Sequence, residues 1–224
     1  MASITQILLL SLRVSVEAEK VINETVTMLR EQKSIRHFRW SMTLQEDNKV
    51  CIFVDWDEKS ALASYLQSDA YQRLLHLMNS QTNEPITVHK VEFGLYGTAV
   101  LDNKGGQGTS PVAEVLYMHF GGAQIEAENF QDNATTTTQE FLQKISLIAT
   151  GLTGESSIGW VLDEVAINGE MCRTCVLVVG WQSVESQLRF LASEDFNSAF
   201  PIIVGMQGFR GASKMFVSNF TIDF

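Results

Sequence analysis

The chain has 224 residues, a length that suits either one large domain or two small ones. Hydrophobic residues make up 45% of it and charged residues 19%, which is typical of a globular protein and not of a disordered one. The net charge of -10, without any cluster of lysines and arginines, argues against nucleic acid and against an anionic membrane surface as partners.

The first apolar run of the chain, residues 4–12, is far too short to span a bilayer. No basic residues precede it and no small-residue cleavage site clearly follows it. We therefore interpret it as a buried strand, and we expect a cytoplasmic protein with no membrane partner.

The first half of the chain reads as a strand, a helix, a two-stranded hairpin, a second helix and a final strand. Ser15 is a suitable N-cap for the first helix, and Val21, Ile22, Val26 and Leu29 recur behind it at helical spacing. The expected ranges are 5–12, 16–33, 37–44, 49–56, 59–78 and 86–94. This βαββαβ order is that of a ferredoxin-like unit.

The second half repeats the same order of elements. Trp56 and Trp181 are 125 positions apart, and Trp40 and Trp160 are 120 apart, with a longer hairpin turn in the second copy. The expected ranges are 113–120, 138–149, 159–167, 174–181, 184–200 and 214–222. Residues 102–111 are rich in Gly, Ser and Pro, as a linker would be. We therefore predict a first unit over 1–94, a linker over 95–112 and a second unit over 113–224.

The segment from Trp56 to Ser68 follows an apolar strand and reads W-x-x-x-S-x-L-x-x-Y-L-x-S. It resembles the dimeric α+β-barrel superfamily, and more narrowly the antibiotic-biosynthesis-monooxygenase (ABM) type, here as a tandem pseudo-dimer. The resemblance implies an α+β fold of two ferredoxin-like units packed sheet to sheet, with a small hydrophobic pocket in each unit between sheet and helices. One chain then forms the interface that single-unit proteins form by dimerising.

Three side chains of the first copy match pocket positions of this superfamily. Tyr65 stands where the ABM type often has His, Tyr71 about where the polyketide-cyclase type has a catalytic His, and Gln6 about where that type has its second His. In the second copy these places hold Phe190, Phe196 and Glu114, and Glu114 is a candidate substrate-binding residue there. Neither copy keeps the His pair, so a His-based deprotonation is not carried over. We expect the working pocket in the first copy, with the tyrosines donating hydrogen bonds to a developing enolate.

Two histidines on predicted strands, His89 and His119, are candidate general bases, with a structural role as the alternative. No histidines have metal-ligand spacing, and we expect neither a metal nor a cofactor. Cys172 and Cys175 have redox spacing, but residues three apart on a strand face opposite sides, so we interpret them as core thiols.

Trp40 and Trp160 open matching strands and are candidate walls for stacking on a substrate, unless a shared structural reason explains both. Residues 121–138 are longer than the matching connection of the first copy. Ile125 and Phe130 could lay this loop across an opening, so we predict a lid or pocket wall, with a tolerated surface insertion as the alternative.

We expect an enzyme that cyclises or isomerises a hydrophobic polyketide- or terpenoid-like natural product without a cofactor. An ABM-type monooxygenase that oxidises a phenolic polyketide is the first alternative, and a non-catalytic ligand-binding or stress-response protein is the second. The expected partner is a hydrophobic small molecule. The protein is expected to be a monomer that forms a pseudo-dimer, with further self-association left open.

Overall fold

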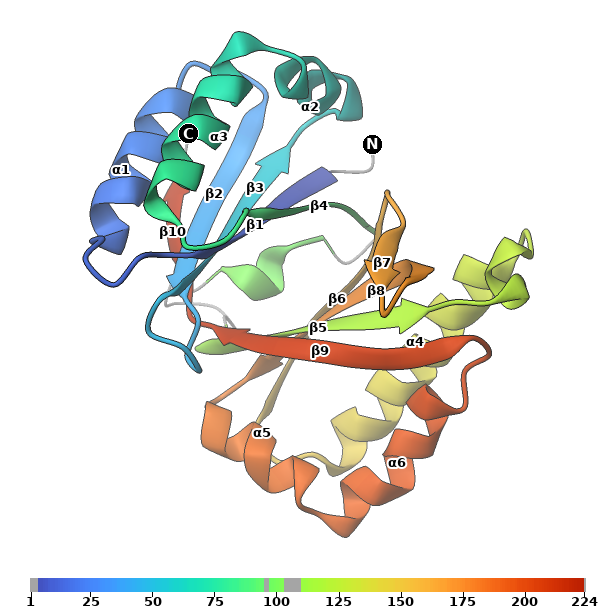
Figure 1. Ribbon diagram of the computed structural model, residues 1–224. Coiled ribbons are helices and arrows are strands. Elements are labelled where there is room, and N and C mark those ends of the chain that lie inside the picture. Colours follow the sequence, from blue (N-terminus) through green and yellow to red (C-terminus); the bar gives the residue numbers. More distant parts are fainter. Residues whose placement is uncertain (1–3, 95–96, 103–109, 224) are drawn as a thin grey trace.

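The structure is a computed structural model that describes residues 4–94, 97–102 and 110–223 (Figure 1). In the first unit and the segment after it, the elements are β1 (Ile4–Ser11), α1 (Ala18–Leu29), β2 (Ile35–Met42), β3 (Lys49–Trp56), α2 (Lys59–Leu66), α3 (Asp69–Gln81), β4 (Thr87–Phe93) and η1 (Ala99–Leu101). In the rest of the chain they are β5 (Val112–Phe120), η2 (Ala123–Glu126), α4 (Phe130–Ile148), β6 (Leu152–Val161), β7 (Val165–Ile167), β8 (Glu170–Trp181), α5 (Val184–Leu191), α6 (Glu194–Val204), β9 (Phe209–Val217) and β10 (Phe220–Asp223).

Each half forms an antiparallel sheet with its helices on one face, which confirms the predicted α+β fold of two ferredoxin-like units. The strand order is β2-β3-β1-β4 in the first unit and β6-β8-β5-β9 in the second. The registers also match, since Gln6 faces Val54 in the first sheet and Glu114 faces Val179 in the second.

The single helices expected over 59–78 and 184–200 are each two helices, so those boundaries were wrong. The break falls at the serine of the repeated Leu-x-Ser, because that serine begins a new helix. Ser68 Oγ accepts the backbone N–H of Tyr71 at 3.2 Å, and Ser193 Oγ accepts that of Phe196 at 3.1 Å. A serine N-cap satisfies an N–H group that would otherwise lack a partner at the helix start.

The two sheets join along both edges and form a barrel with the helices outside (Figure 1). At one seam β4 pairs with β6, where Val91 faces Val161. At the other seam β10 continues from β9 and pairs with β2, where Ile222 faces Phe38. Each unit therefore completes the edge of the other, as two subunits do in a dimer.

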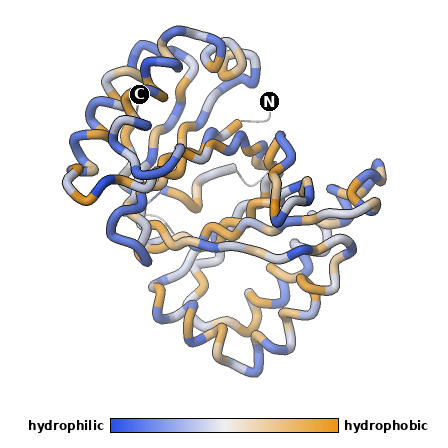
Figure 2. The backbone as a smooth tube through the Cα atoms, viewed as in Figure 1, coloured by the Kyte–Doolittle hydropathy of each residue, from blue (hydrophilic) through white to orange (hydrophobic). Residues whose placement is uncertain are grey.

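Along the helices, hydrophobic and hydrophilic residues alternate, as in amphipathic helices (Figure 2). Each unit has a core between its helices and its sheet, in which Trp56 and Trp181 are fully buried. A third core fills the barrel and draws on both units, with Ile7, Phe53 and Val178 among its members. Burial on both faces explains why the strands read as continuous apolar runs.

Part of the predicted linker is packed inside the barrel. Val100 and Leu101 of η1 are buried in the barrel core, and Thr98 Oγ1 donates to Asp55 at 2.7 Å. Arg39, itself buried, donates to both Asp55 and Asp102. The segment from 97 to 102 therefore closes one end of the barrel, because its apolar residues find a core and its polar ones find buried partners.

The segment 121–138 is not the loop that we expected. Only η2 and a short turn precede α4, which begins at Phe130 and not near residue 136. Phe130, Ala134, Thr138 and Phe141 are all buried on one face of α4, so the helical spacing extends further upstream than the prediction allowed. Among the helices of the described ranges, α4 included, none is long and apolar enough to cross a membrane.

Candidate active site

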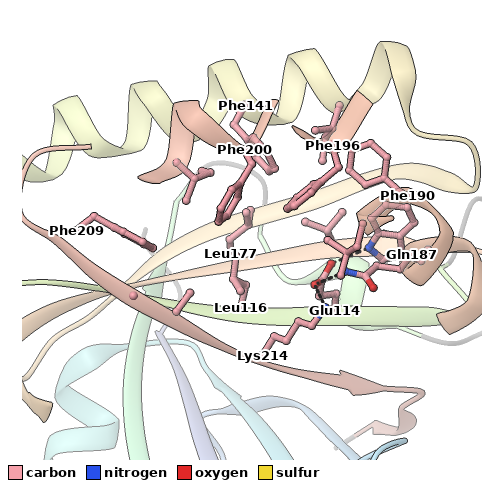
Figure 3. A pocket seen from close by; sticks show the side chains of 17 residues that line it. Glu114, Leu116, Phe141, Leu177, Gln187, Phe190, Phe196, Phe200, Phe209 and Lys214 are labelled. Carbon is pink, nitrogen blue, oxygen red and sulfur yellow. Dashed lines mark hydrogen bonds and ion pairs between the residues drawn. The ribbon is translucent and has the colours of Figure 1, made fainter. Parts of the chain in front are cut away.

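A cavity of about 350 Å³ lies between the sheet and the helices of the second unit (Figure 3). Its walls are mainly apolar and come from strands β5, β8 and β9 and from helices α4, α5 and α6. The apolar lining is Leu116, Phe141, Ile145, Leu177, Val179, Trp181, Phe190, Leu191, Phe196, Phe200, Ile203, Phe209 and Ala212. A small apolar chamber of this kind suits a hydrophobic ligand that is oriented by a few polar groups.

Glu114 of β5 supplies a carboxyl group at one end of this cavity (Figure 3). Its Oε2 accepts the indole N–H of Trp181 at 3.0 Å, and its Oε1 accepts the side-chain amide of Gln187 at 2.8 Å. The ammonium group of Lys214 lies 3.5 Å from Oε1. These contacts fix the orientation of the carboxyl group, and the lysine stabilises its charged form.

The environment of Glu114 suits proton transfer. The residue is only 8% exposed, and this burial is the main cause that raises the pKa of its carboxyl group above the ordinary value. Lys214, Trp181 and Gln187 act in the opposite direction and lower that pKa. A carboxylate whose pKa is raised by burial is a better base than an exposed one.

The matching positions of the first unit explain why the cavity lies in the second. Where the second unit has a polar or small residue, the first has an aliphatic one that packs into or against its core. By the offset of 125 and by the strand registers, Leu62, Leu74 and Val88 correspond to Gln187, Ala199 and Lys214. Ala199 has a smaller side chain than Leu74, its counterpart in the first unit. It lies on the face of α6 that also carries the cavity-lining residues Phe196 and Ile203.

The polar residues that led us to expect a pocket in the first unit belong to its packed core. Tyr65, Tyr71 and Gln6 are 3%, 8% and 1% exposed, and none of them lines the Glu114 cavity. The ring of Tyr65 lies 5.1 Å from that of Trp56 and 5.4 Å from that of Tyr71. Burial raises the pKa of both tyrosines, so both hydroxyl groups stay protonated, and a hydrogen bond with Gln6 opposes the shift only at Tyr71.

The structure places the other predicted site residues away from Glu114. His89 and His119 line a different cavity, between the two sheets. Trp160 donates its indole N–H to Thr135 Oγ1 at 3.0 Å, and its ring packs 5.9 Å from that of Phe130. Trp40 lies on β2, where it faces β10. Of the predicted set, only Glu114 lines the helix-side cavity of the second unit.

A redox site and a metal site are the other two kinds of site that we considered from the sequence. Cys51, Cys172 and Cys175 are buried free thiols, as expected for core cysteines, and burial raises the pKa of each. Within residues 4–94, 97–102 and 110–223, no group of three or more His, Cys, Asp and Glu residues is placed to hold a metal ion.

Sequence reasoning overlooked two polar partners of Glu114, namely Gln187 and Lys214. A signal for Gln187 was present, because the repeat offset of 125 positions aligns this polar residue with the apolar Leu62. A polar residue that replaces a core leucine in only one of two copies marks a place where the copies have diverged in function. Lys214 carries no such signal in the sequence, since its match to Val88 depends on the strand register.

Comparison with known proteins identifies related folds. No protein-family model and no curated protein matches the sequence. The solved structure of an "anthrone oxidase-like protein" matches with a TM-score of 0.71 at 13% identity, covering 100% of this chain and 94% of that chain.

Two structures named "putative monooxygenase" also match. The one from Lactobacillus acidophilus has a TM-score of 0.55 at 8% identity, covering 100% of this chain and 97% of that chain. The one from Fusobacterium nucleatum has a TM-score of 0.59 at 9% identity, covering 99% and 94%. The chain thus shares the fold of these three proteins over nearly its whole length.

Proposed function

We propose that the protein is an enzyme that oxidises a hydrophobic aromatic molecule of the anthrone or phenol class with dioxygen and without a cofactor. The observation that carries the proposal is the buried carboxyl group of Glu114 at the end of an apolar, phenylalanine-rich cavity. The names of the proteins that share the fold support the reaction class. In this proposal the chain works as a monomer, and its two units form the barrel together.

Glu114 takes a proton from the carbon or oxygen atom that becomes electron-rich. For an anthrone this is the CH₂ group between the two rings, and its loss of a proton gives a stabilised carbanion that dioxygen can oxidise. The resulting hydroperoxide loses water and leaves a ketone, so that R₂CH₂ and O₂ become R₂C=O and H₂O. Glu114 returns its proton to the peroxide anion, which becomes the hydroperoxide; this restores the carboxylate, and the loss of water needs no further proton.

The lining residues orient the substrate for this step. The rings of Phe196 and Phe200 stack with centroids 5.0 Å apart, and together with Phe190 they offer flat apolar surfaces to an aromatic ligand. Trp181 and Gln187 hold the carboxyl group in place while its charge changes, and Lys214 favours its ionised form. Exclusion of water from the apolar part strengthens these interactions.

Cyclisation or isomerisation of a polyketide-like substrate is the second candidate. It is favoured by the same carboxyl group, because Glu114 could return its proton to a second carbon atom of the enolate instead of to a peroxide. A pure isomerase needs no oxidant, so the two candidates differ in their use of dioxygen. A non-catalytic carrier would release its ligand chemically unchanged.

The test is to incubate the purified protein with a dihydroxyanthrone in aerated and in anaerobic buffer. The products and the consumption of dioxygen are measured against an enzyme-free control that corrects for autoxidation. We expect one dioxygen consumed for each anthraquinone formed, and no turnover without oxygen. Glu114→Gln should lose about a hundredfold or more of the rate, whereas the exposed Glu128→Gln should lose none. Turnover under anaerobic conditions would support the isomerase, and recovery of unchanged anthrone would contradict the proposal.

A further inference from the structure

The barrel has a second cavity of about 600 Å³, at the end where strand β1 finishes. The opposite end, where β1 begins, is closed by the segment 97–102 through Thr5, Asp55 and their partners. Both units contribute to the second cavity, with Leu9 and His89 from the first and with His119 and Met215 from the second. Val165 and Ile167 of the hairpin strand β7 also line it.

Three polar aromatic side chains line this cavity together. The ring of His89 lies 5.3 Å from that of Tyr117, and Nδ1 of His119 lies 3.0 Å from the hydroxyl oxygen of Thr174. Tyr117 is 5% exposed, and its buried hydroxyl group has no hydrogen-bond partner among the described residues. The side chain of Tyr117 therefore contributes its ring to the wall of this cavity.

Both lysines that line the cavity are paired with a carboxylate. The ammonium group of Lys49 lies 2.8 Å from the carboxylate of Glu46, and that of Lys214 lies 3.5 Å from Glu114. Glu84 is the remaining charged residue of the lining, and it is exposed. The groups that can change charge near neutral pH are therefore the two imidazoles.

The surroundings of both imidazoles favour their uncharged form. Burial lowers the pKa of His89 and of His119, and the neighbouring His119 lowers that of His89 further. A negative charge brought into the cavity would reverse this, because it favours the imidazolium form. A ligand that carries an acidic group would then bind together with a proton.

We propose that this cavity between the units is a second ligand site, which binds apolar organic acids with uptake of a proton by His89 or His119. The carboxylate pairs with the imidazolium. Leu9, Val165 and Met215 provide the contact surface for an apolar ring. No covalent bond changes in this binding. Lys214 lines both cavities, but this binding needs no step of the reaction proposed for the Glu114 cavity.

The probe is 2-naphthoate, and its neutral match is 2-naphthalenemethanol. Each is titrated into the protein by calorimetry at pH 6, 7 and 8, in buffers with different ionisation heats, which report the number of protons taken up. Where one proton is taken up, we expect the affinity for naphthoate to rise about tenfold for each unit by which the pH is lowered. The alcohol should show neither proton uptake nor this dependence.

Variants then assign the site. His89→Gln with His119→Gln should abolish proton uptake and the pH dependence, while Glu114→Gln, in the other cavity, should keep both. If the double variant does not fold, Thr87→Trp serves in its place. Thr87 is an exposed residue of β4 that lines the cavity, so a tryptophan there should weaken naphthoate binding at least tenfold by steric exclusion. The proposal is overturned if naphthoate does not bind, if binding and proton uptake persist in the histidine or Trp variants, or if Glu114→Gln alone removes them.

Discussion

The indole N–H of Trp181 donates to Oε2 of Glu114 at 3.0 Å, whereas the matching indole N–H of Trp56 is buried without a partner among the described residues. The two tryptophans occupy the same place in the repeat, at the end of β3 and of β8. The difference shows that one copy has kept a structural anchor, while the other has tied that anchor to an acidic group in a cavity. It motivates the first prediction.

Trp181→Phe should lower kcat/KM about tenfold, because a hydrogen bond to a charged group contributes roughly 1.5–3 kcal/mol. Loss of this donor also leaves the pKa of Glu114 higher, so activity should begin to fall at a higher pH than in the wild type. Trp56→Phe is the matched control, and it should leave both kcat/KM and the pH profile unchanged. Equal pH profiles for all three proteins would show that the indole does not act on Glu114.

Ala199→Leu should close the cavity, because residue 199 lies on the same face of α6 as the lining residues Phe196 and Ile203. We expect the KM for a dihydroxyanthrone to rise about tenfold or more, with little loss of thermal stability, since the added atoms fill a space. The reverse change in the first unit, Leu74→Ala, should cost about 2–5 kcal/mol of unfolding free energy and leave the KM alone. An unaltered KM in Ala199→Leu would place substrate binding elsewhere.

Tyr65→Phe should keep full activity and raise the unfolding free energy by about 1 kcal/mol, because it removes a buried hydroxyl group that has no partner among the described residues. Tyr71→Phe should instead lose about 0.5–1.5 kcal/mol, since its hydroxyl group interacts with Gln6. Urea denaturation and initial rates measure the two effects. A large fall in turnover in both variants would return the active site to the first unit, as the sequence alone had suggested.

The free energy of unfolding should fall as the pH is lowered from 7.5 toward 5. His89 and His119 have their pKa values lowered in the folded protein, so below about 6.5 the unfolded chain binds more protons than the folded one. Protonation therefore favours unfolding, and the stability contributed by the neutral imidazoles is present above that pH. The double variant His89→Gln, His119→Gln should lose less stability over this range. A wild-type stability that rises on acidification would contradict the assignment of neutral imidazoles.

Much of the fold could be predicted from the sequence because its signals are local and repeated. The tryptophan spacings and the apolar runs of four to eight residues indicate the strands, and helical spacing indicates α1 and the later turns of α4. The break between α2 and α3 was missed, although Ser68 is a good N-cap, because the apolar pattern continues across it. The start of α4 was missed because Asn, Asp and Thr residues resemble a loop by composition.

The candidate site was harder to predict, because a cavity depends on what fills space and not on which residues are reactive. Tyr65 and Tyr71 have more chemistry than Phe190 and Phe196, yet they pack tightly against Trp56 and against each other. In the second unit Ala199 stands where the first has the larger Leu74, and this small residue carries no chemical signal. Likewise, the burial of Thr98, Val100 and Leu101 depends on long-range contacts that their position beside a Gly-rich stretch of sequence conceals.

The most direct test of the account is the pH dependence of kcat/KM for a dihydroxyanthrone in wild-type protein, Glu114→Gln and the surface control Glu128→Gln. Because the base works only when ionised, the wild type and the control should lose activity as the pH falls through the pKa of Glu114, which burial raises above 4.5. Glu114→Gln should be slower by about a hundredfold or more and should lack this acid limb. A Glu114→Gln variant that keeps the wild-type rate and the same acid limb would show that Glu114 is not the base.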